Sequence, residues 1–152
     1  MIKLSTDRLI HIKLIKKDQN KVDARKLITD LIDGGWSIIY NNTISYLGVR
    51  DNGNYDWQEK QISLNDFFDI AKTKQDNDEV IGVIIRWEDS EIGGTLIIHP
   101  DLEVSFLISI NTKKLKLANN EEVVDVNWYI EKLVILLKNK KYIIERFAYE
   151  EF

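Results

Sequence analysis

The stretch from Val80 to Ile110 constrains the fold most, because apolar residues alternate along it with the period of a half-buried strand. Its three apolar runs, separated by turn-forming residues, are Ile81–Trp87, Thr95–Ile98 and Val104–Ile110. We expect these runs to form three consecutive antiparallel strands at the centre of one sheet. Closure by a two-residue turn at Pro100 and Asp101 would place Ile97 opposite Val104.

The first third of the chain predicts a strand, a helix and a hairpin. Residues 8–17 alternate as a strand, and apolar residues spaced three and four apart over 22–32 predict a helix that Gly34 and Gly35 end. Two β-rich runs, 36–40 and 43–49, flank Asn41-Asn42, a pair that suits a tight turn because Asn tolerates positive φ. This hairpin would place Ile39 opposite Ile44 and Trp36 opposite Leu47.

The remaining segments complete an α+β fold. They are predicted as a strand over 55–62, a helix capped by Ser63, a polar loop over 73–79, a connection over 111–122, a helix over 126–139 capped by Asp125, a strand over 142–148 and an acidic tail over 149–152. Tight turns between neighbouring strands favour antiparallel pairing. We therefore expect residues 1–152 to form a single α+β domain, a mainly antiparallel sheet with about three helices packed on it.

Composition excludes several classes of protein. With 152 residues, 44% hydrophobic and 30% charged, the chain can bury a real core and is far from a disordered composition. It has no cysteine, hence no disulfide framework, and no apolar run long enough to cross a membrane. Its N-terminus lacks the apolar segment of a signal peptide, so we expect a cytoplasmic protein without a membrane partner.

Charge is unevenly spread along the chain. Formal charge is +4 over residues 1–50, −9 over 51–103 and +1 over 104–152. The acidic middle is either a set of solvated loops and helix faces or a docking surface for a basic partner. A docking surface of this charge would raise the association rate of a basic partner. Nucleic acid is disfavoured as a partner because this segment would repel phosphate.

The sequence contains few residues in patterns typical of catalysis. His11 and His99 are far apart in sequence and neither has a second metal ligand at the usual spacing, so both are interpreted as structural residues. The chain has no glycine-rich phosphate loop and no nucleophile elbow. The acidic runs 76–79 and 88–91 lack the spacing of a calcium loop. We therefore expect no enzymatic activity, no catalytic residue, no cofactor and no metal.

Aromatic residues beside acids are the remaining candidates for a binding surface. Tyr55-Asp56-Trp57 and Trp87-Glu88-Asp89 combine rings with carboxylates, which is typical of a hot spot that faces Lys and Arg. The alternative is that these rings belong to the core. We expect the acidic middle to form most of one surface that binds the partner. The candidate contact residues, with Trp57 as the aromatic anchor, are Asp56, Trp57, Glu59, Asp76, Asp78, Glu88, Asp89 and Glu91.

The stretches Gly93–Pro100 (GGTLIIHP) and Asp125–Ile130 (DVNWYI), within a small, cysteine-free, acidic α+β chain, resemble the immunity proteins of bacterial polymorphic toxin systems such as contact-dependent growth inhibition. The resemblance is one of type over the whole chain, and no functional residue is carried over from it. It implies a cytoplasmic, non-enzymatic protein that binds one cognate toxin C-terminal domain, often a nuclease.

Three functional hypotheses follow from these observations. The first is an inhibitory protein that masks a basic toxin active site through its acidic surface. The second is a small-molecule-binding or regulatory domain with an aromatic pocket. The third is an enzyme that uses carboxylates alone.

Overall fold

The computed structural model describes residues 7–15, 23–101 and 103–152. Its strands are β1 (Arg8–Ile15), β2 (Trp36–Ser37), β3 (Ile39–Tyr40), β4 (Thr43–Leu47), β5 (Trp57–Lys60), β6 (Ile81–Trp87), β7 (Gly93–Ile98), β8 (Glu103–Ile110), β9 (Lys114–Lys116), β10 (Glu122–Val124) and β11 (Ile143–Glu151). Its helical segments are α1 (Ala24–Gly34), α2 (Leu64–Asp76) and a last helix made of α3 (Val126–Tyr129), η1 (Ile130–Ile135) and α4 (Leu136–Asn139). The predicted α+β class is confirmed.

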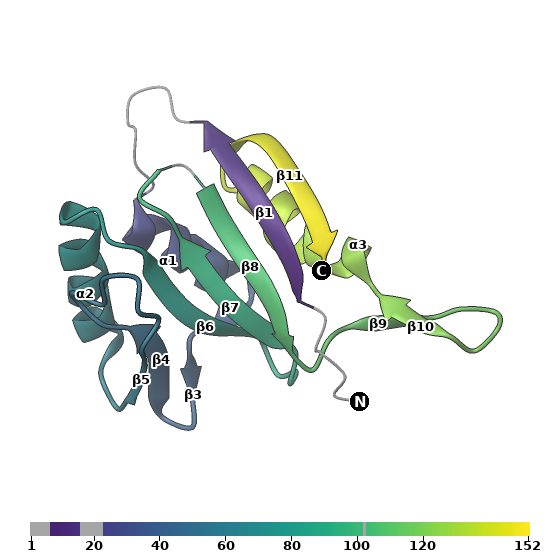
Figure 1. Cartoon of the computed structure of the whole chain (residues 1–152), viewed down its shortest axis with the longest axis horizontal. Coiled ribbons are helices and arrows are strands. Elements are labelled where there is room, and N and C mark those ends of the chain that lie inside the picture. The colour runs from purple at the N-terminus through teal and green to yellow at the C-terminus, as the bar shows by residue number, and fades with distance from the viewer. Residues whose placement is uncertain (1–6, 16–22, 102) are drawn as a thin grey trace.

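One antiparallel sheet carries the fold, in the order β11-β1-β8-β7-β6-β4-β3, with β2 beside β6 and β5 beside β4 (Figure 1). The helices cover one face of this sheet. The core between them includes Ile12 of β1, Phe106 of β8 and Val83 of β6, with Leu27 of α1 and Phe67 of α2. The opposite face of the sheet has no helix over it in the part of the chain that the structure describes (Figure 1).

The three central strands are confirmed, but the predicted register between β7 and β8 is wrong by one residue. Ile98, not Ile97, lies opposite Val104, and the amide of His99 donates to the carbonyl of Glu103 across a longer turn. Ile98 and Val104 are both buried against the helices, whereas the predicted register would set a core residue against one on the open face. The core pattern therefore overrides the two-residue turn.

The hairpin around Asn41 and Asn42 is confirmed in part. Both asparagines have positive φ, 51° and 62°, and Ile39 lies opposite Ile44 as predicted. Trp36, however, lies opposite Trp87 of β6 and not opposite Leu47. Its ring packs against Trp87, Phe106 and Trp128, and its indole N–H donates to the carbonyl of Lys132 at 2.9 Å. Tertiary aromatic packing thus breaks the longer hairpin.

Three other boundaries differ from the expectation. The segment 73–79 is not all loop, because α2 continues to Asp76 and buries Lys74. The connection 111–122 contributes to the β9–β10 hairpin, which projects from the body (Figure 1). The acidic tail belongs to β11, which pairs with β1 through Glu151. The last helix is π-helical over η1. At its start, Tyr129 is fully buried and Ile130 only partly.

The predicted caps are confirmed at three helix ends. The side chains of Ser63 and Asp125 accept hydrogen bonds from the amides of Asp66 and Trp128 at the starts of α2 and α3. Gly35 ends α1 with a φ of 126°, a conformation that favours glycine, and a Cβ there would also meet the ring of Trp87 at 2.5 Å. No helix among the described residues is long and apolar enough to cross a membrane.

Candidate functional site

The seven predicted acidic contact residues are all exposed, but the structure places six of them at the two ends of β6 and the seventh, Glu59, on β5. Near the start of β6 lies the group that we call the α2-end cluster: Asp56, Trp57, Asp76 and Asp78. After the end of β6 lies the group that we call the β6–β7 turn cluster: Glu88, Asp89 and Glu91. A seven-residue strand rises about 20 Å, so the two clusters do not form one continuous patch.

Glu59 and Trp57 lie on β5, at the edge of the sheet beside β4. Glu59 accepts a hydrogen bond from the hydroxyl of Thr43 at 3.1 Å. Trp57 lies opposite Leu47 and is half-buried. Both side chains lie close to Gly82, where an added Cβ would be 3.0 Å from the ring of Trp57 and 2.7 Å from Leu47. The predicted anchor Trp57 therefore covers part of the open sheet face instead of projecting freely.

A hollow of about 310 Å³ lies beside the α2-end cluster. Its lining comes from the loop after β4 and from the end of α2: Leu47, Asp51, Asn52, Gly53, Tyr55, Lys74, Asn77, Asp78, Glu79 and Val80. The lining has three carboxylates and one ammonium, and that ammonium belongs to Lys74, whose side chain is only 1% exposed. The surface that solvent meets at this hollow is therefore acidic.

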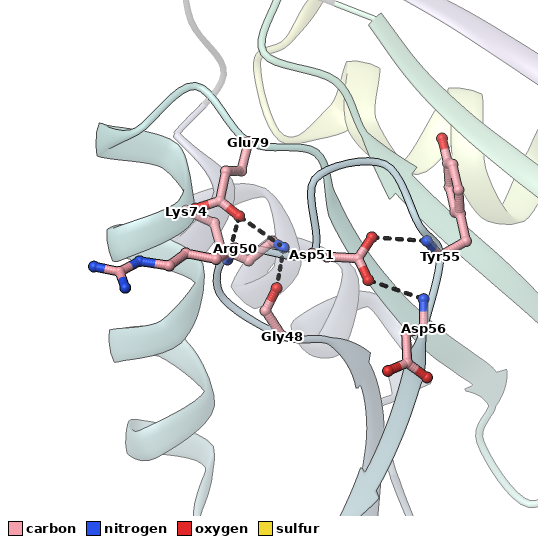
Figure 2. Close-up of polar contacts among 7 residues, drawn as sticks. All are labelled: Gly48, Arg50, Asp51, Tyr55, Asp56, Lys74 and Glu79. Atoms are coloured by element: carbon pink, nitrogen blue, oxygen red, sulfur yellow. Dashed lines mark hydrogen bonds and ion pairs between the residues drawn. The ribbon is translucent and has the colours of Figure 1, made fainter.

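Buried Lys74 lines the hollow, and Figure 2 shows its contacts with the loop after β4 and with Glu79. Its Nζ donates to the carbonyl oxygen of Gly48 at 2.5 Å and lies 3.5 Å from Oε1 of Glu79. The same Oε1 accepts the backbone N–H of Arg50 at 2.6 Å. An ammonium without these partners would be costly to bury, so the loop after β4 is bound to α2 through Lys74 and Glu79.

The loop itself is closed by Asp51. Its two carboxylate oxygens accept the backbone N–H groups of Tyr55 and Asp56 at 2.8 and 2.9 Å (Figure 2). Asp51 and Glu79 thus serve the local structure, whereas the side chains of Tyr55 and Asp56 lie on the exposed outer part of the loop. The ring of Tyr55 is 48% exposed.

Backbone strain is concentrated around this hollow. Arg50, Asn52, Tyr55 and Asp78 have φ values of 65°, 54°, 52° and 55°. Positive φ is costly for residues other than glycine, and most of all for a bulky side chain such as that of Tyr55. Such conformations persist only where the surroundings fix them, and they are enriched at binding clamps and active sites. The hydrogen bonds of Asp51, Lys74 and Glu79 supply that constraint here.

The β6–β7 turn cluster has a simpler construction. The amide of Glu88 donates to the carbonyl of Gly35, and Ser90 closes the turn through bonds to the carbonyl of Trp87. Only Glu88 in this cluster has positive φ, at 32°. None of its three acids lines the hollow at the end of α2.

The structure brings together the two histidines that the sequence leaves far apart. Nδ1 of His11 and Nε2 of His99 each lie 3.2 Å from the buried hydroxyl of Ser105, on the open face of the sheet. A second hollow, of about 270 Å³, adjoins His11 between Lys13, Arg146 and Glu150. Sequence reasoning missed this cluster because β1 pairs with β8 across more than ninety residues, and no local pattern reports that pairing.

These histidines do not complete a metal site. Within residues 7–15, 23–101 and 103–152, no group of three or more His, Cys, Asp or Glu side chains is arranged to hold a metal ion.

One of the rings that stand beside acids in the sequence, Trp87, belongs to an aromatic cluster that packs against the core. Trp36, Trp87, Trp128, Tyr129 and Phe106 pack against one another with ring centres 4.9 to 6.1 Å apart. Neither hollow described above is lined by any of them. Tyr55 is the aromatic side chain that lines the acidic hollow, although Trp57, two residues later, was the predicted anchor.

Comparison with protein-family models, with curated protein sequences and with solved structures gives no match to this chain. Its function is therefore inferred from the geometry and charge of the described residues.

Proposed function

We propose that this chain is a cytoplasmic immunity protein that binds a basic toxin domain, of the nuclease kind, and neutralises it by covering its active site. The contact surface is the acidic hollow at the end of α2. The observation that carries the proposal is the strained loop around that hollow, which the buried Lys74 and the carboxylates of Asp51 and Glu79 hold in place. A surface that is already ordered loses little conformational entropy when it binds.

The chemistry of the hollow favours a cationic protein partner. Tyr55 offers a large exposed ring, a residue type enriched at hot spots, and an aromatic face can also hold a Lys or Arg side chain. Asp56, Asp76 and Asp78 lie around it as exposed carboxylates. A nuclease carries cations where it holds phosphate, so its active site complements this surface in charge. Binding of this kind requires no catalytic residue, cofactor or metal in the inhibitor.

The structure gives less support to a small-molecule-binding domain with an aromatic pocket. That hypothesis requires the aromatic rings to line a cavity, but Trp36, Trp128 and Tyr129 pack into the core beside other rings.

Co-expression tests the proposal. The C-terminal domain of the polypeptide encoded next to this chain's gene is produced in bacteria, alone and together with this chain. We expect growth arrest by the domain alone and rescue by the wild-type chain. The triple variant Tyr55→Ala, Asp56→Asn, Asp78→Asn should fail to rescue, because it removes the ring and two charges at the hollow.

The matched control is Glu88→Gln, Asp89→Asn, Glu91→Gln, which removes three charges from the β6–β7 turn cluster and should still rescue. Circular dichroism melting of both variants checks that each is folded. Equal rescue by the two variants would contradict the proposed surface, and a neighbouring polypeptide that is neither toxic nor bound would contradict the proposed function.

A further inference from the structure

The strand β11 forms one edge of the sheet and is long for an edge. In the part of the chain that the structure describes, β11 pairs with β1 alone, so its other side offers unpaired backbone groups. Two of its large apolar side chains, Ile143 and Phe147, are 47% and 46% exposed. Exposed edges of this kind are templates for pairing with another strand unless bulges or charges block them.

The hydrogen bonds between β1 and β11 show which backbone groups are available. Asp7 and Phe152 exchange both of their backbone hydrogen bonds, at 2.7 and 2.9 Å. Because hydrogen-bonded and non-bonded pairs alternate along an antiparallel ladder, Arg146, Ala148 and Glu150 also direct their amides and carbonyls toward β1. Phe147 and Tyr149 therefore direct theirs outward. A bulge at residue 145, between the partners of Lys13 and Leu14, ends the regular edge.

The side chains alternate in the same way. Arg146, Ala148 and Glu150 line the hollow beside His11 on the open face of the sheet, whereas Phe147 and Tyr149 lie on the helical face, opposite Ile12 and Ile10. Arg146 also lies opposite Lys13, and among the described residues neither forms an ion pair. Like charges directly opposite each other are unfavourable, so an added carboxylate at this position would be stabilising.

We propose that β11 pairs with β11 of a second copy of this chain, antiparallel about a two-fold axis at Ala148. In that register Phe147 lies opposite Tyr149 of the other copy, and these two residues exchange the hydrogen bonds that both direct outward. Arg146 lies opposite Glu150 of the other copy on the open face, twice over by symmetry. Each copy thus supplies the carboxylate that the Arg146 and Lys13 of the other copy lack.

Neighbouring registers lack this complementarity. A two-fold axis at Phe147 would set Arg146 against Ala148 and Glu150 against Ile144, and an axis at Tyr149 would set Arg146 against Phe152. Only the axis at Ala148 combines outward-directed backbone pairs with opposite charges and paired aromatic rings. The contact is short, so we expect a reversible dimer and not an obligate one. It lies at the opposite edge of the sheet from β5 and leaves the hollow at the end of α2 open.

The absence of cysteine in the chain permits a direct test of the register. Residues on the two-fold axis form a non-hydrogen-bonded pair with Cα atoms about 4.5 Å apart, which lies within the range that a disulfide spans. Ala148→Cys should therefore give a covalent dimer under mild oxidation at low protein concentration. Ser109→Cys, an exposed position on the same face of the sheet in β8, is the control and should form no covalent dimer.

Charge exchange tests the same contact without a disulfide. Sedimentation equilibrium should show wild-type dimers, about tenfold weaker association or more for Arg146→Glu and for Glu150→Arg, and recovery in the double variant. A wild-type chain that stays monomeric at several hundred micromolar, with no preferential cross-linking of Ala148→Cys, would overturn the proposal. A wild-type dimer that neither charge variant weakens and that Ala148→Cys does not trap would also overturn it, because the contact would then lie elsewhere.

Discussion

The two acidic clusters at the ends of β6 have similar compositions and different constructions. Both present exposed carboxylates beside an aromatic residue, and both fall within the −9 segment. The α2-end cluster lies beside a hollow whose walls include three left-handed residues, Asn52, Tyr55 and Asp78. Asp51 and the buried Lys74 brace the loop that forms one of these walls. The β6–β7 turn cluster is an ordinary strand connection with a single left-handed residue. Local sequence reports the charge of a surface, but only tertiary contacts show whether that surface is preorganised.

The largest expected effect comes from removing the ammonium under the hollow. Lys74→Met keeps the length of the side chain but leaves the Gly48 carbonyl and Glu79 without their cation. We expect the free energy of unfolding to fall by about 3 kcal/mol, the lower end for breaking a buried pair, because Glu79 keeps some contact with water. Urea denaturation measures this change.

Lys72→Met is the control for that measurement. Lys72 forms an exposed i, i+4 pair with Asp76 on the same helix, at 3.0 Å. Its loss should cost about 0.3–0.5 kcal/mol. If the two lysine variants lost equal stability, Lys74 would not be what holds the loop in place.

A smaller effect is expected on binding when the exposed ring at the hollow is removed. Tyr55→Ala should weaken binding of the toxin domain by about 2 kcal/mol, roughly 30-fold in Kd, mainly through faster dissociation. Tyr40→Ala is the matched control, since Tyr40 is 41% exposed but lies on β3 under the guanidinium of Arg86. Biolayer interferometry against the immobilised toxin domain separates the two rates. A Tyr40 variant as weak as the Tyr55 variant would remove the distinction between the hollow and the rest of the surface.

The smallest effect concerns the strain at the loop. At Tyr55, with a φ of 52°, Gly should be more stable than Ala by about 1 kcal/mol, because only glycine adopts this conformation without a penalty. At the next residue, Asp56, where φ is not positive, Ala should equal or exceed Gly. Thermal unfolding of the four single variants gives both differences. The same order at both positions would indicate that the loop is not strained at Tyr55.

Local patterns predicted the parts of the fold that local chemistry decides. The period-two runs predicted β6, β7 and β8, and the two asparagines predicted the pairing of Ile39 with Ile44. Ser63 and Asp125 marked helix starts correctly because capping involves only the next few residues. These interactions are short in sequence, so a single chain is enough to recognise them.

Non-local contacts account for the misses. Trp36 pairs with Trp87 in an aromatic cluster and not with its predicted hairpin partner. The β7–β8 register is the one that buries Ile98 together with Val104. The helix α2 includes Lys74, whose buried ammonium donates a hydrogen bond to the carbonyl of Gly48, 26 residues away. For the candidate site, the sequence identified the acidic segment and the 55–57 stretch. It could not show that the acids separate into two clusters, because that depends on the direction of β6.

Partner binding at the hollow is tested most directly by the rate at which the toxin domain associates with two charge variants, each lacking two carboxylates. One is Asp56→Asn with Asp78→Asn at the hollow, and the other is Glu88→Gln with Asp89→Asn at the β6–β7 turn. Association is measured by stopped flow at several salt concentrations, since exposed charges mainly set the association rate and salt screens them. We expect slower association and a shallower salt dependence for the first variant, with near wild-type behaviour for the second. Equal slowing by both variants, or slowing by the second alone, would contradict the assignment of partner binding to the hollow at the end of α2.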